Sequence, residues 1–168
     1  AIVLGANYRI SVITERVIRL EYSPNGQFVD APTQLIKKRR VGIPDFFIRQ
    51  DANIVEVTTK YFALSYIKGQ PFVGSKVDKM KNLKITLLSK DRDRRKDWYF
   101  GHPEARNMKG NMVGVDVSIP ENLKRGLYSL DGFVSLDDSN SKLIMEDGTL
   151  ADPPADHTDI YVFMYDRD

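Results

Sequence analysis

Apolar and polar residues alternate one by one in several short segments, and this alternation restricts the fold more than any other feature of the sequence. It runs through residues 17–22 (VIRLEY), 54–58 (IVEVT) and 83–87 (LKITL). Side chains of a β-strand point in turn to opposite faces of a sheet, so each segment predicts a strand with one buried face. No window of about a dozen residues has apolar groups at helical spacing between a cap and a stop signal. The sequence therefore predicts an all-β protein.

Two pairs of these segments are close enough along the chain to form hairpins. Tyr8–Ile13 is separated from Val17–Tyr22 by only three residues, and Ile54–Thr58 from Tyr61–Ile67 by only two. Strands joined by such short loops pair in antiparallel fashion. We therefore expect a mainly antiparallel sheet.

A third hairpin is predicted in the segment GLYSLDGFVSLDDS, residues 126–139. Asp131 and Gly132 form a dipeptide that tolerates the positive φ angles of a type I′ turn. On either side of this turn the residues are strand-like. The segment predicts that Leu127–Leu130 pairs with Phe133–Leu136.

Residues 159–165 (DIYVFMY) form a nearly unbroken apolar run near the C-terminus. Such a run is typical of a strand that is buried on both faces, so we expect it at the centre of a sheet. Many short strands with short connections predict a two-layer antiparallel β-sandwich. A length of 168 residues suits a single domain spanning residues 1–168.

The charge composition excludes some classes of partner. With 25 basic and 23 acidic residues the net charge is +2, which is too balanced to predict an electrostatically attracted partner. Lys37–Arg40 is a basic run and Lys90–Lys96 alternates charges, but neither has interleaved aromatics for base stacking. We expect surface loops at both places and no nucleic-acid partner.

The sequence contains no cysteine, which excludes disulfides and thiolate zinc sites and favours a reducing compartment. Its apolar runs are far shorter than the roughly 20 residues of a transmembrane helix, so no membrane partner is expected. The first residues, AIVLGANYR, lack the basic start and cleavage site of a signal peptide. These features predict a cytoplasmic protein.

Two adjacent carboxylates, Asp137 and Asp138, are candidate catalytic acids. Neighbours on a strand point to opposite faces, whereas the carboxylates of a glycosidase flank one bond about 5 to 10 Å apart. Asp138, Ser139 and Asn140 belong to residue types that bond the local backbone. We expect them to close a turn rather than to act in catalysis or bind calcium.

His102 and His157 are the only histidines, and they lie too far apart in sequence for metal-ligand spacing. A triad of Ser129, His102 and Asp116 lacks a nucleophile elbow, and no glycine-rich phosphate loop is present. The sequence therefore predicts loop histidines, no catalytic residue, no metal site and no cofactor.

Trp98, Tyr99 and Phe100 allow two interpretations. Consecutive aromatic residues in a β-protein alternate between core and surface, which favours core packing. Alternatively, a ring left exposed would present a flat face to a sugar. The second interpretation makes the chain a free-standing carbohydrate-binding module, so it remains an alternative function.

The region 101–125 is the least regular part of the sequence, because two prolines and two glycines interrupt its weak apolar runs. A loop of this length in a compact domain is often functional. A simple connection between sheets fits equally well.

Several stretches, taken in their order and spacing, resemble one enzyme family over nearly the whole chain. They are RISVIT (9–14), VIRLEYS (17–23), WYFG (98–101), NMKGN (107–111), GLYSLDGFVSLDDS (126–139) and DIYVFMY (159–165). The set is similar to the N-terminal part of glycoside hydrolase family 31, the α-glucosidase and α-xylosidase group.

This resemblance implies a galactose-mutarotase-like sandwich followed, in the complete enzyme, by a catalytic (β/α)8 barrel. The barrel of these retaining enzymes supplies the aspartate nucleophile and the acid/base carboxylate. The chain would then be a noncatalytic domain whose partners are the barrel of the same polypeptide and an α-linked oligosaccharide. Activity as an aldose mutarotase needs a paired acid and base, which the separated histidines argue against.

The resemblance also implies that a loop of the sandwich reaches over the mouth of the barrel and helps to bind sugar. Residues 107–116 match that loop, which makes Asp116 and Asn107 the candidate substrate-binding residues. The sequence departs from the family pattern at Lys109, where the family has glycine, and at Asn111, where it has threonine. A turn-capping role for Asp116 remains open.

Overall fold

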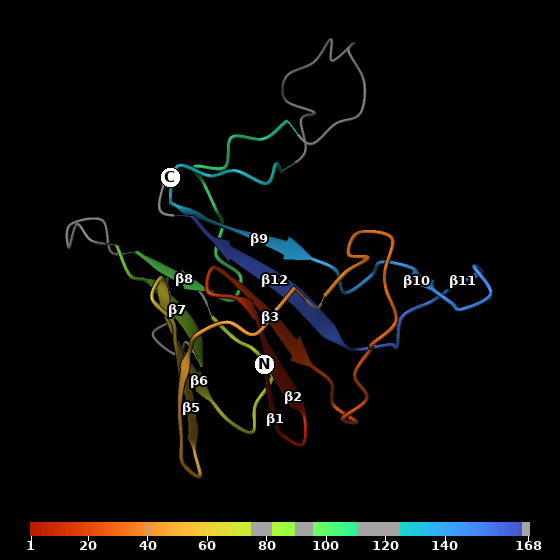
Figure 1. Ribbon diagram of the computed structural model, residues 1–168, viewed down its shortest axis with the longest axis horizontal. Helices are drawn as coiled ribbons and strands as arrows, with labels where there is room; N and C mark the ends of the chain where they lie inside the picture. The colour runs from red at the N-terminus through yellow and green to blue at the C-terminus, as the bar shows by residue number, and fades with distance from the viewer. Residues whose placement is uncertain (40, 75–81, 90–95, 111–124, 166–168) are drawn as a thin grey trace.

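The computed structural model describes residues 1–39, 41–74, 82–89, 96–110 and 125–165. These residues contain no helix and form two five-stranded antiparallel sheets that pack face to face, with a small two-stranded ribbon beside them (Figure 1). The predicted all-β fold and the two-layer antiparallel β-sandwich are confirmed.

The first sheet has the strand order β1-β2-β3-β12-β9. Its strands are β1 (Ile2–Leu4), β2 (Tyr8–Thr14), β3 (Val17–Tyr22), β12 (Thr158–Met164) and β9 (Phe133–Asp137). β2 and β3 form the first predicted hairpin. β12 lies between β3 and β9, which confirms that the apolar C-terminal run occupies an inner position of a sheet.

The second sheet has the strand order β4-β5-β6-β7-β8. Its strands are β4 (Phe47–Gln50), β5 (Ile54–Thr58), β6 (Phe62–Ile67), β7 (Leu83–Leu87) and β8 (Asp97–Tyr99). β5 and β6 form the second predicted hairpin. The separate ribbon consists of β10 (Leu143–Ile144) and β11 (Leu150–Ala151).

The hydrophobic core lies between the two sheets, where the alternating apolar residues meet. Fully buried side chains from both layers include Ile10, Leu20, Phe62, Tyr66 and Val162, each with 0% exposure. The Tyr66 ring meets those of Tyr8 and Phe72 edge to face, at centroid distances of 5.0 and 5.3 Å. The alternation thus fixes which face of each sheet is internal.

The third predicted hairpin is wrong. β9 pairs with β12, from Phe133 opposite Met164 onward, and not with residues 127–130. A turn does form, since the Gly132 amide donates to the Ser129 carbonyl at 3.3 Å, but Asp131 lacks the positive φ of a type I′ turn. Pairing over five residues with a central, buried strand outweighs the local preference of an Asp-Gly turn, which is worth little by itself.

Candidate functional site

The predicted sugar-binding loop leaves one end of the sandwich as two extended arms, residues 104–110 and 125–130 (Figure 1). The arms run antiparallel, with Asn107 bridged to Ser129, and the Met108 amide donates to the Tyr128 carbonyl at 2.9 Å. Asp116 lies outside the described residues. The structure therefore describes the base of the loop, where Asn107 lies.

The side chain of Asn107 holds the two arms together. Its Nδ2 donates to the Gly126 carbonyl at 2.9 Å, and its Oδ1 accepts from the amides of Gly126 at 2.9 Å and Lys109 at 2.8 Å. A Cβ added at Gly126 would lie 2.4 Å from the Lys109 carbonyl oxygen, so the arms approach too closely for any other residue there. These bonds give Asn107 a positioning role at the base of the loop.

Replacing Asn107 by alanine is expected to loosen the arms without unfolding the sandwich. The change removes the hydrogen-bond partners of two amides, each worth about 1 kcal/mol. Hydrogen exchange followed by NMR should then show faster exchange at Lys109 and Gly126, by roughly fivefold. Asn140→Ala, at an exposed turn, is the matched control. Unchanged exchange at both amides would contradict the positioning role.

A buried carboxylate fixes the start of both arms to β9. Glu104 is 2% exposed; its Oε1 accepts from the Ser135 amide at 2.7 Å and from the Ser135 hydroxyl at 2.5 Å. Its Oε2 is ion-paired with Arg125, which begins the second arm. No sequence pattern marks these residues, because their partners are 21 to 31 positions away along the chain.

The end of β12 is joined to the second arm. The Tyr165 hydroxyl donates to the Ser129 carbonyl at 2.8 Å and accepts from the Ser129 amide, while the Tyr165 ring stacks on Tyr128 at 5.1 Å. Burial raises the pKa of Tyr165, so its hydroxyl keeps its proton for this bond. The loop base and Tyr165, which directly follows β12, therefore share one end of the described sandwich.

Three large hydrophobic side chains of the two arms are exposed on the same face of the bridged pair, and we call them the arm surface. They are Met108, Tyr128 and Leu130, with exposed fractions of 56, 45 and 37%. Lys96 and Arg106 lie beside this surface, at 2.7 and 3.5 Å from Asp131. An apolar surface with a basic rim is typical of a protein contact.

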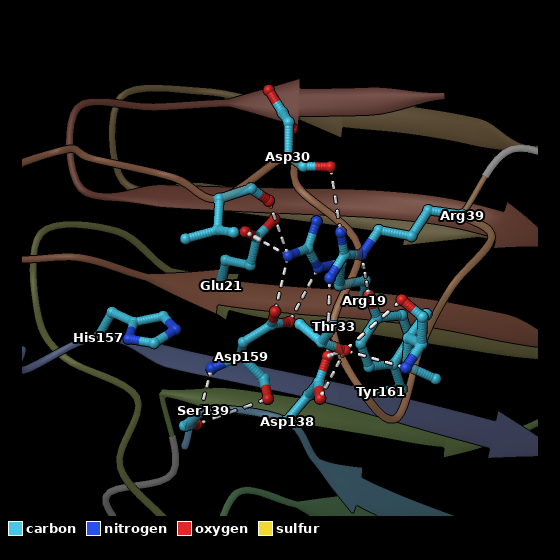
Figure 2. Close-up of polar contacts among 12 residues, drawn as sticks. Arg19, Glu21, Asp30, Thr33, Arg39, Asp138, Ser139, His157, Asp159 and Tyr161 are labelled. Carbon is cyan, nitrogen blue, oxygen red and sulfur yellow. Dashed lines mark hydrogen bonds and ion pairs between the residues drawn. The ribbon is translucent and has the colours of Figure 1, made fainter. Parts of the chain in front are cut away.

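The outer face of the first sheet carries a second polar cluster, and this one is buried (Figure 2). Arg19 donates to both carboxylate oxygens of Asp159, at 2.8 and 2.6 Å, and Arg9 to both of Glu21, at 2.5 and 2.8 Å. Both arginines also donate to the Val29 carbonyl, at 2.9 and 3.0 Å. The segment after β3 covers these charges, which is why they are not solvated.

The protonation states in this cluster follow from burial and pairing. Burial raises the pKa of Glu21 above its ordinary value, although Arg9 and Arg19 act in the opposite direction. Burial alone would lower the pKa of Arg19, but the hydrogen bonds and charge of Asp159 raise it. Since each guanidinium is matched by a carboxylate, the cluster is best explained as an internal fastening of the fold.

Residues 37–39 lie in a loop as predicted, but the Arg39 side chain turns inward. Its Nε donates to the Tyr161 hydroxyl at 2.7 Å, and its Nη2 lies 3.7 Å from Asp138. Burial raises the pKa of Tyr161 to about 12. Lys37 and Lys38 are exposed as predicted, while Arg40 lies outside the described residues, as do residues 90–95 of the second charged run.

The predicted turn does form, since the Asp138 carbonyl accepts from the Ser141 amide at 3.1 Å, but the Asp138 side chain does not bond the local backbone as expected. Its carboxylate accepts from the Thr33 hydroxyl at 3.0 and 2.8 Å, 105 positions away, and is 1% exposed. The local bond is made by its neighbour instead, since Asp137 Oδ1 accepts from the Ser139 amide at 3.0 Å. The buried Asp138 carboxylate holds the segment after β3 against the sheet through its bond with Thr33.

The aromatic run and the histidines do not form a site. Trp98 is 2% exposed and belongs to the core, and Phe100 packs partly buried against it, which confirms core packing for these two rings. Tyr99 is 5% exposed and meets the His102 ring at a centroid distance of 4.9 Å. His102 Nδ1 accepts from the Glu104 amide at 3.0 Å, and His157 Nδ1 lies 2.6 Å from the Pro154 carbonyl. The two histidines thus have separate structural partners in loops.

The described residues offer neither a metal site nor a membrane-spanning helix. Among the described residues, no three His, Cys, Asp or Glu side chains are grouped as metal ligands would be. No helix in that part of the chain has the length and apolar character needed to cross a membrane. In comparisons with known proteins, no family model and no curated protein matches the chain.

Proposed function

We propose that this chain is the noncatalytic N-terminal β-sandwich of a retaining α-glycosidase of family 31, packed on the catalytic barrel of the same polypeptide. The ordered likeness of its sequence stretches supports this function, and the sandwich fold agrees with it. The barrel would supply the catalytic carboxylates and act on an α-linked glycoside. The lack of cysteine supports a cytoplasmic location for the parent enzyme.

The observation that carries the proposal is the junction between Tyr165 and the second arm. Because Tyr165 bonds to Ser129 and stacks on Tyr128, a barrel that follows this strand would lie directly beside the loop. The exposed arm surface would then be covered by the barrel. Burying its apolar side chains would contribute about 25 cal/mol for each Å² removed from water.

Within this arrangement the two candidate sugar-binding residues have different roles. Asn107 positions the loop, because two of its hydrogen bonds join the arms and a third fixes Lys109 in its own arm. Asp116, which lies outside the described residues, would be the residue that binds a sugar hydroxyl. A carboxylate is suited to this because it accepts hydrogen bonds from two neighbouring hydroxyls.

The test uses the complete polypeptide that this proposal requires, in which a catalytic barrel follows the sandwich. Met108→Asp and Leu130→Asp would place charges in the proposed interface, which costs several kcal/mol if they are buried there. We expect hydrolysis of 4-nitrophenyl α-glucoside or α-xyloside to fall at least tenfold in these variants. The same substitutions should leave the unfolding of the isolated sandwich nearly unchanged, because both side chains are exposed there.

Three results would overturn this proposal. They are turnover of an aryl α-glycoside by the isolated chain, a reading frame that ends at Asp168, and full activity in both interface variants. Leu35→Asp, at another exposed leucine, is the control for a general effect of added charge.

The alternative of a carbohydrate-binding module that uses Trp98 loses its support. With 2% exposure, the Trp98 ring has no face available for a sugar. Any sugar-binding surface must therefore use other residues.

A further inference from the structure

The outer face of the second sheet carries two cross-strand rows of side chains. The strand register aligns one row as Phe47, Thr58, Ala63, Thr86 and Asp97, and the other as Arg49, Glu56, Ser65, Lys84 and Tyr99. Because residues two apart on a strand share a face, both rows point away from the core. No residue of this face belongs to the arm surface.

A shallow groove of about 420 Å³ runs over these rows. Its floor consists of small, half-buried side chains, namely Thr58, Ala63, Ser65 and Thr86. From β4 to β7 the rows extend over roughly 14 Å, since neighbouring strands lie about 4.8 Å apart. The groove is therefore long enough for a chain of sugars rather than for a single ring.

The most exposed aromatic ring of the described residues borders this groove. Phe47 is 82% exposed although it lies within a strand. Exposure of a phenylalanine ring to water is unfavourable in free energy, and packing within the sandwich does not offset it. Its ring face is available for packing against an apolar partner surface, such as the C–H face of a pyranose.

The charges around the groove compensate one another. Arg49 Nε lies 2.7 Å from Glu56, and Lys84 Nζ lies 3.6 Å from Asp97. Two cations and two anions leave no net charge, which does not favour an ionic ligand. Their polar atoms, with the hydroxyls of the floor, offer many hydrogen-bond donors and acceptors to a neutral polar ligand.

We propose that this groove binds a neutral oligosaccharide, with one sugar ring packed on Phe47 and its hydroxyls bonded across the floor. A protein partner fits less well, because the floor has no large apolar side chain for a hydrophobic interface centre. The groove shares no residue with the arm surface, and the proposal does not rest on the proposed function.

Titration with maltohexaose, cellohexaose and xylohexaose, followed by NMR, tests the site in the chain as it is. At least one of these probes should bind with millimolar affinity and shift the amides of β5, β6 and β7. Phe47→Ala should weaken this binding about fivefold to tenfold, as expected for loss of one ring contact. Ala63→Gln, which fills the groove with an uncharged side chain, should abolish it.

The matched control is Tyr128→Ala, which removes an exposed ring at the arm surface and should leave the affinity unchanged. Absence of binding by all three probes would overturn the proposal. So would binding that Tyr128→Ala weakens as much as Phe47→Ala, or tighter binding of an anionic oligogalacturonate. None of these outcomes depends on glycosidase activity, so they distinguish this site from the proposed function.

Discussion

Replacing Arg19 by methionine is expected to lower the free energy of unfolding by about 3–5 kcal/mol. Arg19 is 3% exposed and donates to both oxygens of Asp159, while its Nη2 also lies 3.0 Å from Glu21. Without the guanidinium, Asp159 becomes a buried carboxylate without its cation. Leaving one charge of a buried pair uncompensated is among the most costly single changes a protein can undergo.

Urea unfolding measures the loss of unfolding free energy in Arg19→Met, and two further variants serve as comparisons. Arg49→Met breaks an ion pair whose arginine side chain is 82% exposed, and should cost less than about 1 kcal/mol. Arg19→Met combined with Asp159→Leu removes both charges, so this double variant should be more stable than Arg19→Met alone. A cost of Arg19→Met no greater than that of Arg49→Met would contradict the buried network.

The same residues explain why the sequence predicts the sheets better than the buried charges. Arg19 and Glu21 occupy polar positions in an alternating strand, and such positions are normally solvated. They are buried because the segment after β3 folds over them, and the Val29 carbonyl of that segment accepts from Arg19. That segment has no periodicity, so nothing local in the sequence indicates the surface that it covers.

The failed hairpin at Asp131 has a related cause. Turn preference is a local signal, whereas the choice of partner for β9 depends on β12, more than 20 residues later in the chain. The two hairpins that were predicted correctly join strands that follow each other directly along the chain and pair with each other in their sheets. Local sequence patterns therefore predict the strands, whereas burial against strands far away in sequence determines part of the strand pairing.

The candidate site likewise combines a feature that the local sequence predicts with long-range contacts that it does not predict. The irregular composition of region 101–125 indicates a loop, and Asn107 lies in a described part of that region outside the named strands. Its contacts with Gly126, and those of Glu104 with Arg125, join the two ends of the loop over about 20 positions. A single sequence carries no signal for contacts of this kind, because neither partner is part of a motif.

Trp98→Ala is expected to cost about 3–5 kcal/mol of unfolding free energy, which is the range for large aromatic side chains in a core. Trp98 lies on β8 opposite Ile85 and belongs to the hydrophobic core, so its removal leaves a cavity between the sheets. Phe47→Ala removes an exposed ring and should change the stability by less than about 0.5 kcal/mol. Trp98→Ala therefore tests the role of an aromatic ring in folding, and Phe47→Ala tests its role in the proposed sugar binding.

A conservative variant sharpens this comparison. Among the described residues no hydrogen-bond acceptor is found for the buried indole nitrogen of Trp98. Trp98→Phe removes that unpaired donor and keeps much of the packing, so it should cost clearly less than Trp98→Ala. Thermal or urea unfolding of the three variants provides the measurement. If Trp98→Ala left stability intact but abolished binding of a hexasaccharide, the core assignment of Trp98 would be wrong and its ring would have to be a sugar platform.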